Sequence, residues 1–314
     1  MQTLSPQELP WLDSPNFSKL LARSPLDART KALVQHYADY GYVVVDLEMP
    51  DFDRRSQEII QGLATEYRGQ QRIQDAWLFN PAVRAIAIQP QILALLEVFY
   101  QRRPIPFQTL NFPIGTQQRT HSDTIHFHSL PERYMCGVWV ALEDIDLYNG
   151  PLHYYPGSHK LPIVEFQNIG LTPGYANYGK YEDYIQSLIL NHGLERVELS
   201  VRQGQALIWS ANLLHGGSPI LDHTRTRHSQ VTHYFFADCL YYKPMLSTPD
   251  QKYLYEVVDI STRQLATQTY EGQAIAYRDP RSWRSLLSKK LRLFHPFLAK
   301  QLHRLSILKQ QLSL

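Results

Sequence analysis

The chain has 314 residues, of which 44% are hydrophobic and 19% are charged, and its formal net charge is +2. This length suits one large domain or two small ones, and the composition is ordinary for a globular protein. The small net charge gives no indication of nucleic-acid binding. The start of the chain has no basic segment followed by an apolar one, and no apolar run approaches the ~20 residues that span a bilayer. We therefore expect neither a signal peptide nor a transmembrane segment, and the two cysteines, Cys136 and Cys239, favour buried thiols in a cytoplasmic protein.

The N-terminal part is expected to supply helical support. The stretch up to about residue 27 is rich in Pro and Ser and is predicted to be irregular. Apolar residues at helical spacing predict a helix over 28–40, which Gly41 ends, and a strand follows at 42–45. Two further helices are predicted at 52–68 and 91–101, so that residues 28–104 form a helical support beside the core.

From residue 105 to 245 short β-rich runs alternate with turn residues. These runs are 106–112, 134–142, 152–155, 196–201, 206–209, 230–236 and 240–242. Many short strands with Pro, Gly and Asn turns predict a sandwich or barrel. A long excursion at 161–193, with a helix at 181–191, interrupts the strands, and insertions of this kind often serve as active-site lids.

The tail is basic and amphipathic. After Asp279 the chain holds eight basic residues and no acidic one, and four leucines between 298 and 312 recur at helical spacing. This pattern predicts basic amphipathic helices over 280–314 at the end of a single domain that spans 1–314. Two roles remain open for them: the leucines pack on the core with the basic residues in solvent, or residues 284–312 contact an anionic membrane surface.

His121, Asp123 and His215 form a candidate metal site. A histidine and a carboxylate two residues apart lie on the same face of an extended strand, and a histidine from a distant strand can complete a triangle. Two imidazoles and one carboxylate on one face of a metal are the ligand set of non-haem iron(II) oxygenases. Glycines follow His215 and allow the backbone to approach closely.

His126 and His128 are a rival pair with the His-x-His spacing of cupin-type metal sites. If one strand runs unbroken from 121 to 128, they face away from His121 and Asp123, and the two pairs cannot share a metal. We prefer the first pair because it supplies the carboxylate. For His126 and His128, lining of the pocket mouth, packing on tyrosine and substrate contact all remain open.

Arg227 is a candidate anchor for a dicarboxylic co-substrate. It follows His215 in the next strand-like run, and a guanidinium pairs bidentately with a carboxylate. Arg227 and Ser229 share one strand face, so both side chains can converge on one carboxylate. Arg225 has the same register but lies nearer the turn, and it is the second choice.

Six short stretches between residues 121 and 234 together form a recognisable pattern. They are His121-Ser122-Asp123, Val138-Trp139-Val140-Ala141-Leu142, Asn149-Gly150-Pro151-Leu152, Pro156-Gly157-Ser158-His159-Lys160, His215-Gly216 and the run 227–234. They cover most of residues 105–240 and resemble the phytanoyl-CoA dioxygenase family, a branch of the iron(II)- and 2-oxoglutarate-dependent oxygenases. The opening of that family is also similar to Tyr40-Gly41-Tyr42-Val43-Val44-Val45 after its helix.

The resemblance implies a mainly β fold, a double-stranded β-helix (jelly-roll, cupin-like) core with flanking helices. It implies that His121, Asp123 and His215 bind Fe(II), and that Arg227 binds the C5 carboxylate of 2-oxoglutarate, which reacts together with O₂. Trp139 matches a family position near the co-substrate, with core packing as the alternative. His159 matches the histidine of the family's Pro-Gly-Ser/Thr-His element. It could contact the site, but we prefer the interpretation that this element is a structural turn.

The chain departs from the family pattern in two places. The spacing from His215 to Arg227 is one residue longer than usual, which keeps Arg225 open. A basic residue often found upstream of the His-x-Asp motif is replaced in Phe112-Pro113-Ile114, so we expect Gln108 or Asn111 to substitute for it. Asp123 is present where related halogenases carry a small residue, which favours hydroxylation.

We therefore expect an oxygenase that hydroxylates a C–H bond of a small polar metabolite or natural-product intermediate and releases succinate and CO₂. The candidate substrate-binding residues are Arg119, His126, His128, Arg225 and Tyr155. Positive charge on the arginines and histidines suits a carboxylated or phosphorylated molecule, and tyrosine suits a polar one that forms hydrogen bonds. Two alternatives remain: a cupin-like metal enzyme that does not use 2-oxoglutarate, and a non-catalytic jelly-roll binding module.

Overall fold

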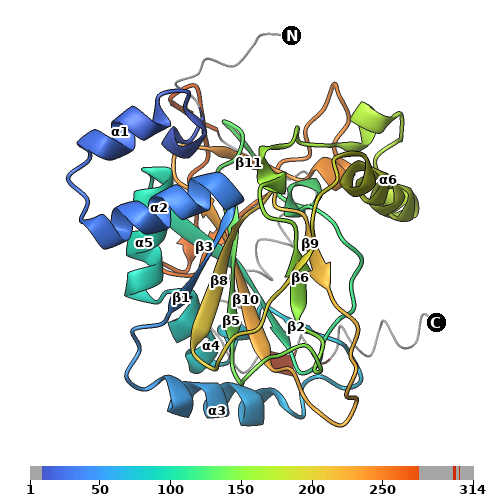
Figure 1. The fold of residues 1–314 in the computed structure, drawn as a ribbon. Helices are drawn as coiled ribbons and strands as arrows, with labels where there is room; N and C mark the ends of the chain where they lie inside the picture. The colour runs from blue at the N-terminus through green and yellow to red at the C-terminus, as the bar shows by residue number, and fades with distance from the viewer. Residues whose placement is uncertain (1–8, 276–299, 302–303, 305–314) are drawn as a thin grey trace.

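The computed structural model describes residues 9–275, 300–301 and 304 (Figure 1). Its α-helices are α1 (Phe17–Arg23), α2 (Ala28–Tyr40), α3 (Phe52–Leu63), α4 (Pro81–Ala87), α5 (Pro90–Tyr100) and α6 (Tyr178–Asn191). Its strands are β1 (Tyr42–Asp46), β2 (Ile73–Gln74), β3 (Pro104–Phe112), β4 (His128–Leu130), β5 (Met135–Ala141), β6 (Leu152–Tyr154), β7 (Val197–Glu198), β8 (Gln205–Ser210), β9 (His215–Gly217), β10 (Ser229–Phe236), β11 (Leu240–Tyr242), β12 (Val258–Asp259), β13 (Gln264–Leu265), β14 (Thr269–Tyr270) and β15 (Gln273–Ala274).

Two antiparallel sheets form the core. The larger has the strand order β1-β8-β5-β10-β3-β2 and the smaller has the order β7-β6-β9. One apolar cluster contains Leu110 and Trp139 from the large sheet and Tyr154 from the small one, so the two sheets pack face to face. This arrangement agrees with the jelly-roll core expected from the sequence. It leaves the inner faces of both sheets available for a site.

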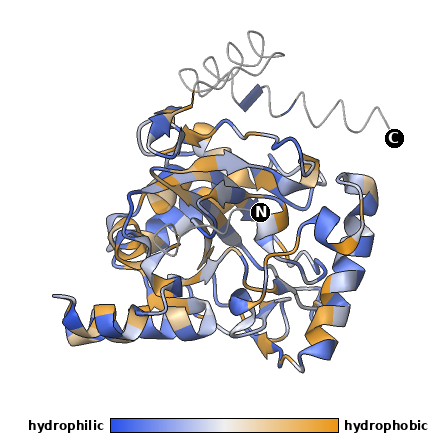
Figure 2. Ribbon diagram, turned by 90° about the horizontal axis from the view of Figure 1, so that it is seen from above, coloured by the Kyte–Doolittle hydropathy of each residue, from blue (hydrophilic) through white to orange (hydrophobic). Residues whose placement is uncertain are grey.

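Helices cover the outer face of the large sheet. Along β5, Val138 and Val140 belong to the cluster shared with α2–α5, while Trp139 between them faces the small sheet, as the alternation of a strand requires. Helix α3 buries Phe52, Ile59 and Leu63, which lie on one helical stripe. Figure 2 shows such helices with hydrophobic residues on one side and hydrophilic residues on the other. The site is therefore built on a sheet that is supported from behind.

The helices and strands agree with most of the sequence expectations. Helix α2 spans the predicted residues 28–40, and Gly41 ends it in the left-handed conformation with φ of 80°. The helix predicted at 52–68 ends earlier, at Leu63. The N-terminal stretch predicted to be irregular contains α1, because Phe17 and Leu21 pack into the core. Helix α4 was not predicted from the sequence.

One stretch, Pro81–Tyr100, is long and apolar enough to cross a membrane by length and composition alone. It comprises α4 and α5, and Ile86, Ile92 and Leu96 within it are buried in the core. Core helices of other proteins pass the same test, so this stretch is weak evidence for a membrane segment.

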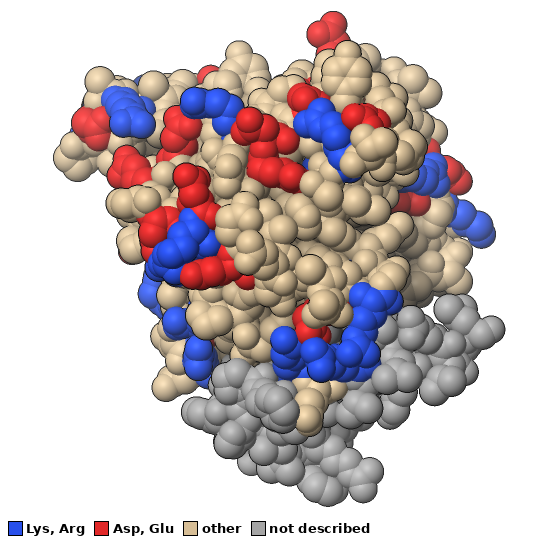
Figure 3. Space-filling view, turned by 90° about the horizontal axis from the view of Figure 1, so that it is seen from below, with Lys and Arg blue, Asp and Glu red and all other residues tan. Residues whose placement is uncertain are grey.

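The predicted helices at 280–314 lie almost entirely outside the described residues. Lys300 and Arg304 are described and helical, and their side chains form ion pairs with Glu66 at 3.0 and 2.6 Å. The Glu66 side chain is fully buried. On the face of the molecule seen from below, basic and acidic side chains lie beside one another in several groups (Figure 3).

We expect the Glu66 ion pairs to stabilise the fold in a pH-dependent way. Hydrogen bonds from Arg304, with Lys300 beside it, lower the pKa of Glu66 from 4.5 to about 2. The stabilisation is therefore fully present above pH 4.5 and is lost as the pH falls towards 2. Thermal unfolding of Glu66→Gln should show less acid destabilisation over this range than the wild type. The exposed Glu58→Gln is the control, and equal acid profiles for all three proteins would contradict the assignment.

Candidate active site

Backbone pairing between distant strands brings the two metal-site histidines together. His121 and His215 exchange backbone hydrogen bonds of 2.9 and 3.0 Å across an isolated bridge. The chain does not continue as a strand from there, because Ser122 caps a 3₁₀ turn at Asp123–Ile125. The condition of one unbroken strand from 121 to 128 is therefore not met, and the turn brings Asp123 back towards both histidines.

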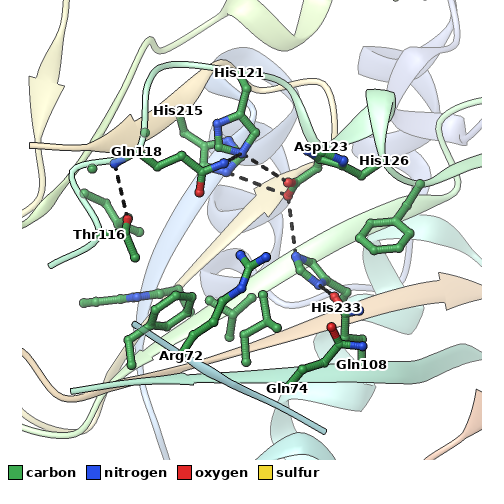
Figure 4. A pocket seen from close by; sticks show the side chains of 18 of the residues that line it. Arg72, Gln74, Gln108, Thr116, Gln118, His121, Asp123, His126, His215 and His233 are labelled. Carbon is green, nitrogen blue, oxygen red and sulfur yellow. Dashed lines mark hydrogen bonds and ion pairs between the residues drawn. The ribbon is translucent and has the colours of Figure 1, made fainter. Parts of the chain in front are cut away.

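The side chains of His121, Asp123 and His215 converge on one point (Figure 4). One ligand atom from each lies within 4.8 Å of the others. The Asp123 carboxylate oxygens lie 3.7 Å from His121 Nε2 and 3.8 Å from His215 Nε2, too far for hydrogen bonds.

Hydrogen bonds from the Nδ1 atoms of both histidines fix the ring tautomers. His121 Nδ1 donates to the Arg119 carbonyl and His215 Nδ1 donates to the Leu213 carbonyl, both at 2.9 Å. Each Nε2 therefore directs a lone pair towards the shared point. The donor set, its spacing and its orientation fit a divalent metal ion such as iron(II).

The protonation states also suit a metal. Burial acts to raise the pKa of Asp123, but the neighbouring His215 and His121 outweigh it and hold the carboxyl well below its ordinary value. Burial lowers the pKa of His215 to about 4, although Asp123 acts in the opposite direction. At neutral pH the carboxylate is ionised and the His215 imidazole is neutral, as metal coordination requires.

Three more side chains hold this centre. Trp209 Nε1 donates to Asp123 Oδ2 at 2.9 Å, and Gln118 donates to His121 Nε2 at 3.3 Å. His233 donates through Nδ1 to Gln108 at 3.0 Å, which leaves its Nε2 facing Asp123 Oδ2 at 3.7 Å. The Trp209 hydrogen bond orients the Asp123 carboxylate, and partners of this kind strongly affect metal affinity. The Gln118 amide instead occupies the His121 Nε2 lone pair, so this contact would give way to a metal.

Glycines make room for this packing. Gly137 on β5 lies opposite Trp209 on β8, and a Cβ at Gly137 would come within 2.2 Å of the indole ring. Gly216 and Gly217 allow the loop at 116–118 to approach, since a Cβ at either position would lie under 3 Å from the backbone of that loop. The close approach expected after His215 is therefore present.

We expect Trp209→Phe to weaken iron binding. The change removes the N–H donor to Asp123 while it keeps an aromatic ring, and lost second-layer partners typically cost about 10- to 100-fold in metal affinity. Anaerobic Fe(II) titration measures the effect. Trp77→Phe is the matched control, because Trp77 also donates to a carboxylate, that of Asp75, but away from the site. Equal Fe(II) affinity in all three proteins would show that this hydrogen bond has no role.

A cavity of about 400 Å³ opens beside the centre. The large sheet contributes Gln108, Leu110, Phe112, Trp139, Trp209, Val231 and His233, and the small sheet contributes Leu152, His215 and its glycines. Tyr175 and Tyr178 come from the excursion at 161–193. The excursion therefore forms part of the cavity wall.

Arg227 lies in the wall of the cavity with only 1% of its surface exposed. Its Nη1 donates to Ser229 Oγ at 2.7 Å and its Nε donates to the Gly150 carbonyl at 3.1 Å. Burial lowers its pKa to about 10, so the guanidinium stays charged at neutral pH. Among the described residues no carboxylate forms an ion pair with it. A buried cation without a counter-ion is costly, which suggests that a ligand supplies the anion.

Trp139 lies beside Arg227, with the guanidinium carbon 5.5 Å from the ring centroid. The indole N–H is buried and has no hydrogen-bond partner in the described part of the chain. Trp139 thus combines the two roles considered from the sequence, because it packs in the core and lines the cavity.

Two predicted arginines lie outside the cavity. Arg225 is on the surface, where it forms an ion pair with Asp146 at 2.9 Å. Arg119 pairs with Asp183 at 2.6 Å and with Glu182 at 3.3 Å, both on α6. The expectation that they bring charge to the cavity is therefore not met, since each is already neutralised by surface carboxylates.

The other predicted residues divide between cavity and core. His126 lines the cavity and forms a hydrogen bond of 3.2 Å with the Tyr178 hydroxyl. His128 is instead buried against Tyr242 and Glu165. The two rings therefore do not converge on one point. Tyr155 packs in a separate apolar cluster. Gln108 lines the cavity. Asn111 lies on the opposite face of β3 and bonds Gln230.

Polar and charged side chains are among the cavity-lining residues that the sequence reasoning missed, and five of them bear on the argument. They are Arg72, Gln118, Trp209, His233 and Lys243. The alternation of side chains along a strand could have predicted His233, because it places His233 on the same face as Ser229 and Val231. Arg72 precedes the two-residue strand β2, and no local pattern reveals that strand.

Comparison with known sequences identifies related proteins. The sequence model of the phytanoyl-CoA dioxygenase (PhyH) family matches residues 39–228. Peroxisomal phytanoyl-CoA dioxygenase from Rattus norvegicus is 26% identical over 250 residues, which cover 74% of this chain and 68% of the rat protein. Phytanoyl-CoA dioxygenase domain-containing protein 1 from Mus musculus is 30% identical over 84 residues, 26% of this chain and 29% of the mouse protein.

Solved structures share the fold. The α-ketoglutarate-dependent carbocyclase SnoK from nogalamycin biosynthesis superposes with a TM-score of 0.55 at 18% identity, covering 69% of this chain and 87% of SnoK. EctD from S. alaskensis, with 2-oxoglutarate and 5-hydroxyectoine, gives 0.53 at 18% identity, covering 75% and 85%. These likenesses confirm the jelly-roll fold class expected from the sequence.

Proposed function

Because the chain belongs to the phytanoyl-CoA dioxygenase family, we propose that it hydroxylates a C–H bond of a small polar metabolite or natural-product intermediate. It is a non-haem iron(II)- and 2-oxoglutarate-dependent dioxygenase, for which O₂ is the second co-substrate and succinate and CO₂ are the co-products. The family resemblance found in the sequence is thereby confirmed. Hydroxylation and the identity of the substrate are the parts that this proposal adds.

His121, Asp123 and His215 are the proposed metal ligands. All three line the cavity, so a metal that they held would be accessible from it to 2-oxoglutarate and the substrate. Iron supplies the oxidising chemistry when it is bound, and the protein orients the reactants and excludes water. Three protein ligands, including the Asp123 carboxylate, support hydroxylation rather than halogenation.

The observation that carries the co-substrate assignment is the buried, charged Arg227 in the cavity wall. We assign the C5 carboxylate of 2-oxoglutarate to its guanidinium, with the Ser229 hydroxyl holding Nη1 in place. The unpartnered Trp139 N–H beside it supports an oxygen-rich ligand at this position. Arg225 does not suit this role, since it lies on the surface in an ion pair.

The excursion at 161–193 is the proposed cover of the cavity. Tyr178 on α6 bonds His126, and Arg119 connects the metal-site loop to α6 through Glu182 and Asp183. These contacts support a covering role for the excursion, and exclusion of water favours controlled oxidation over side reactions.

The alternatives are less well supported. A cupin-like centre built on His126 and His128 requires both rings at one metal, yet they contact different partners. A binding module without metal leaves unexplained why three ligand atoms converge with lone pairs directed inward.

Co-substrate turnover tests the proposal. Purified protein with Fe(II) and O₂ should convert 2-oxoglutarate to succinate slowly without substrate, and a library of small polar molecules should reveal those that accelerate conversion and gain one oxygen atom by mass spectrometry. Asp123→Ala is the inactive control. A protein that binds Fe(II) but neither binds nor consumes 2-oxoglutarate would overturn the assignment and favour the cupin-like alternative.

A further inference from the structure

One ring nitrogen in the cavity wall has no role in the proposed metal centre. His233 is 5% exposed and lines the cavity, and its Nδ1 donates to Gln108 Oε1 at 3.0 Å. Its Nε2 has no hydrogen-bond partner in the described part of the chain. Resting on the proposed function, we propose that His233 Nε2 accepts a hydrogen bond from a hydroxyl group of the primary substrate and so positions a neighbouring C–H bond beside the metal.

Strand pairing fixes the position of His233. On β10 it lies directly opposite Gln108 on β3, and both side chains line the cavity. The register of the two strands shifts at the next residue, Tyr234, and such irregularities commonly redirect a side chain beside an active site. The imidazole packs against Phe107 and Phe127, with ring centroids 6.1 and 5.4 Å away. Hydrogen bonding and packing therefore hold the ring in one orientation.

This orientation leaves a hydrogen-bond acceptor beside the metal site. A neutral imidazole carries one N–H and one lone pair, and burial favours the neutral ring. Because Gln108 Oε1 takes the N–H, the lone pair of Nε2 faces Asp123 Oδ2 at 3.7 Å (Figure 4). The carboxylate oxygen is also an acceptor, so these two atoms do not bond to each other. A donor from another molecule is needed to satisfy Nε2.

His233 does not belong to the metal-ligand set. The ligand atoms of His121, Asp123 and His215 lie within 4.8 Å of one another, and this group does not include His233. Its Nε2 instead approaches the centre beside Asp123 Oδ2, the oxygen to which Trp209 also donates at 2.9 Å. A group bound to Nε2 would therefore lie next to a metal ligand, as a substrate that reacts at the metal must.

A hydroxyl group suits Nε2 better than an ammonium group does. Iron(II) at this centre adds positive charge, and Arg72 and Arg227 line the same cavity, so a cationic donor is disfavoured. A hydroxyl donates a hydrogen bond without carrying a charge. Phe127, Tyr178 and Met245 line the cavity as well and suit the carbon skeleton of such a molecule. The primary substrate is thus an alcohol that is oxidised at a carbon near its hydroxyl group.

Two probes of nearly equal shape test the inference on the full chain loaded anaerobically with Fe(II) and 2-oxoglutarate. Cyclohexanol can donate a hydrogen bond, whereas cyclohexanone can only accept one. Ligand-observed NMR measures the affinity of each probe, and broadening of the probe signals by the paramagnetic iron reports proximity to the metal. The visible band of the iron-bound keto acid shows that 2-oxoglutarate remains in place.

Three variants separate the acceptor from its surroundings. His233→Phe removes the acceptor and keeps an aromatic ring in its place. Gln108→Leu keeps the imidazole but removes the group that fixes its tautomer. His36→Phe is the matched control, because His36 stacks on Tyr40 away from the cavity. Thermal unfolding shows whether each variant is folded.

We expect wild type to bind cyclohexanol about fivefold more tightly than cyclohexanone, an effect that one neutral hydrogen bond can supply. His233→Phe should bind the two probes about equally and keep the visible band. Gln108→Leu should reduce the preference by a smaller factor, and His36→Phe should behave as wild type. The broadening of the cyclohexanol signals should be stronger in wild type than in His233→Phe.

Equal binding of the alcohol and the ketone to wild type, absence of alcohol binding, or a preference that survives in His233→Phe would overturn the inference. Loss of the visible band in a folded His233→Phe would also overturn it, because His233 would then serve the metal centre. A wild-type protein that gives no visible band fails differently, because that result contradicts the proposed co-substrate.

Discussion

His215→Ala is expected to abolish formation of the iron–2-oxoglutarate complex. The change removes one of the three proposed protein ligands, an imidazole whose tautomer is fixed by the Leu213 carbonyl. It also leaves Asp123 without one of the three histidines that lie within 3.8 Å of its carboxylate. Wild-type protein titrated anaerobically with Fe(II) and 2-oxoglutarate should develop the visible charge-transfer band of a chelated keto acid. The variant should show no band, and its turnover should fall by about 1,000-fold or more, because the metal supplies the chemistry.

Two controls make this result specific. His36→Ala changes a histidine that stacks on Tyr40 and Tyr42 away from the cavity, and it should leave the band intact. His126→Ala removes a cavity histidine outside the ligand set, so it should also retain the band. Loss of the band in His126→Ala with retention in His215→Ala would reverse the assignment of ligands. Thermal unfolding of each variant separates loss of metal from loss of fold.

Arg227→Met is expected to raise the concentration of 2-oxoglutarate needed for half of the visible band by roughly 100-fold, which corresponds to about 2.8 kcal/mol. Methionine can fill the space beside the Trp139 and Phe112 rings, over which the guanidinium carbon lies at 5.5 and 5.9 Å, but it carries no charge. Binding of Fe(II) alone should be unchanged, because Arg227 contacts none of the three ligands. The measurement is the same anaerobic titration at fixed iron.

A second keto acid shows whether Arg227 acts on the distal carboxylate. 2-Oxobutyrate chelates the metal in the same way but has no C5 carboxylate. Wild type should strongly prefer 2-oxoglutarate, and Arg227→Met should bind the two keto acids about equally. Arg225→Gln should behave as wild type. The opposite result would be that Arg227→Met still prefers 2-oxoglutarate to 2-oxobutyrate while Arg225→Gln does not. Arg225, not Arg227, would then bind the C5 carboxylate.

The sequence was sufficient for the features that depend on local pattern. The helical period of α2 and its end at Gly41, the shared face of Arg227 and Ser229, and the grouping of His121, Asp123 and His215 all follow from spacing and composition. The same rule of alternation excludes Asn111 from the cavity once β3 is placed, because Gln108 and Leu110 occupy the inner face.

Other features depend on contacts that no local pattern encodes. Arg119 pairs with α6 across 63 and 64 residues of sequence, and Trp209 meets Asp123 across 86 residues. In one continuous strand, His126 would face away from the metal ligands. The 3₁₀ turn at Asp123 breaks that alternation, so His126 faces the cavity with them. The sequence therefore predicted Asp123 and Arg227 in the cavity but not Arg72 and Lys243, whose positions depend on the folded chain.

Trp209 gives this centre an optical reporter. Its ring lies 5.1 Å from that of His215 while its N–H bonds Asp123, so its emission responds to whatever occupies the site. An open-shell ion at this range should quench indole fluorescence, whereas Zn²⁺, with its filled d shell, should not. Five tryptophans are present, and comparison with Trp209→Phe at saturating metal isolates the contribution of this one, since that variant is expected to bind iron more weakly. Metal occupancy can thus be followed in time with no added label.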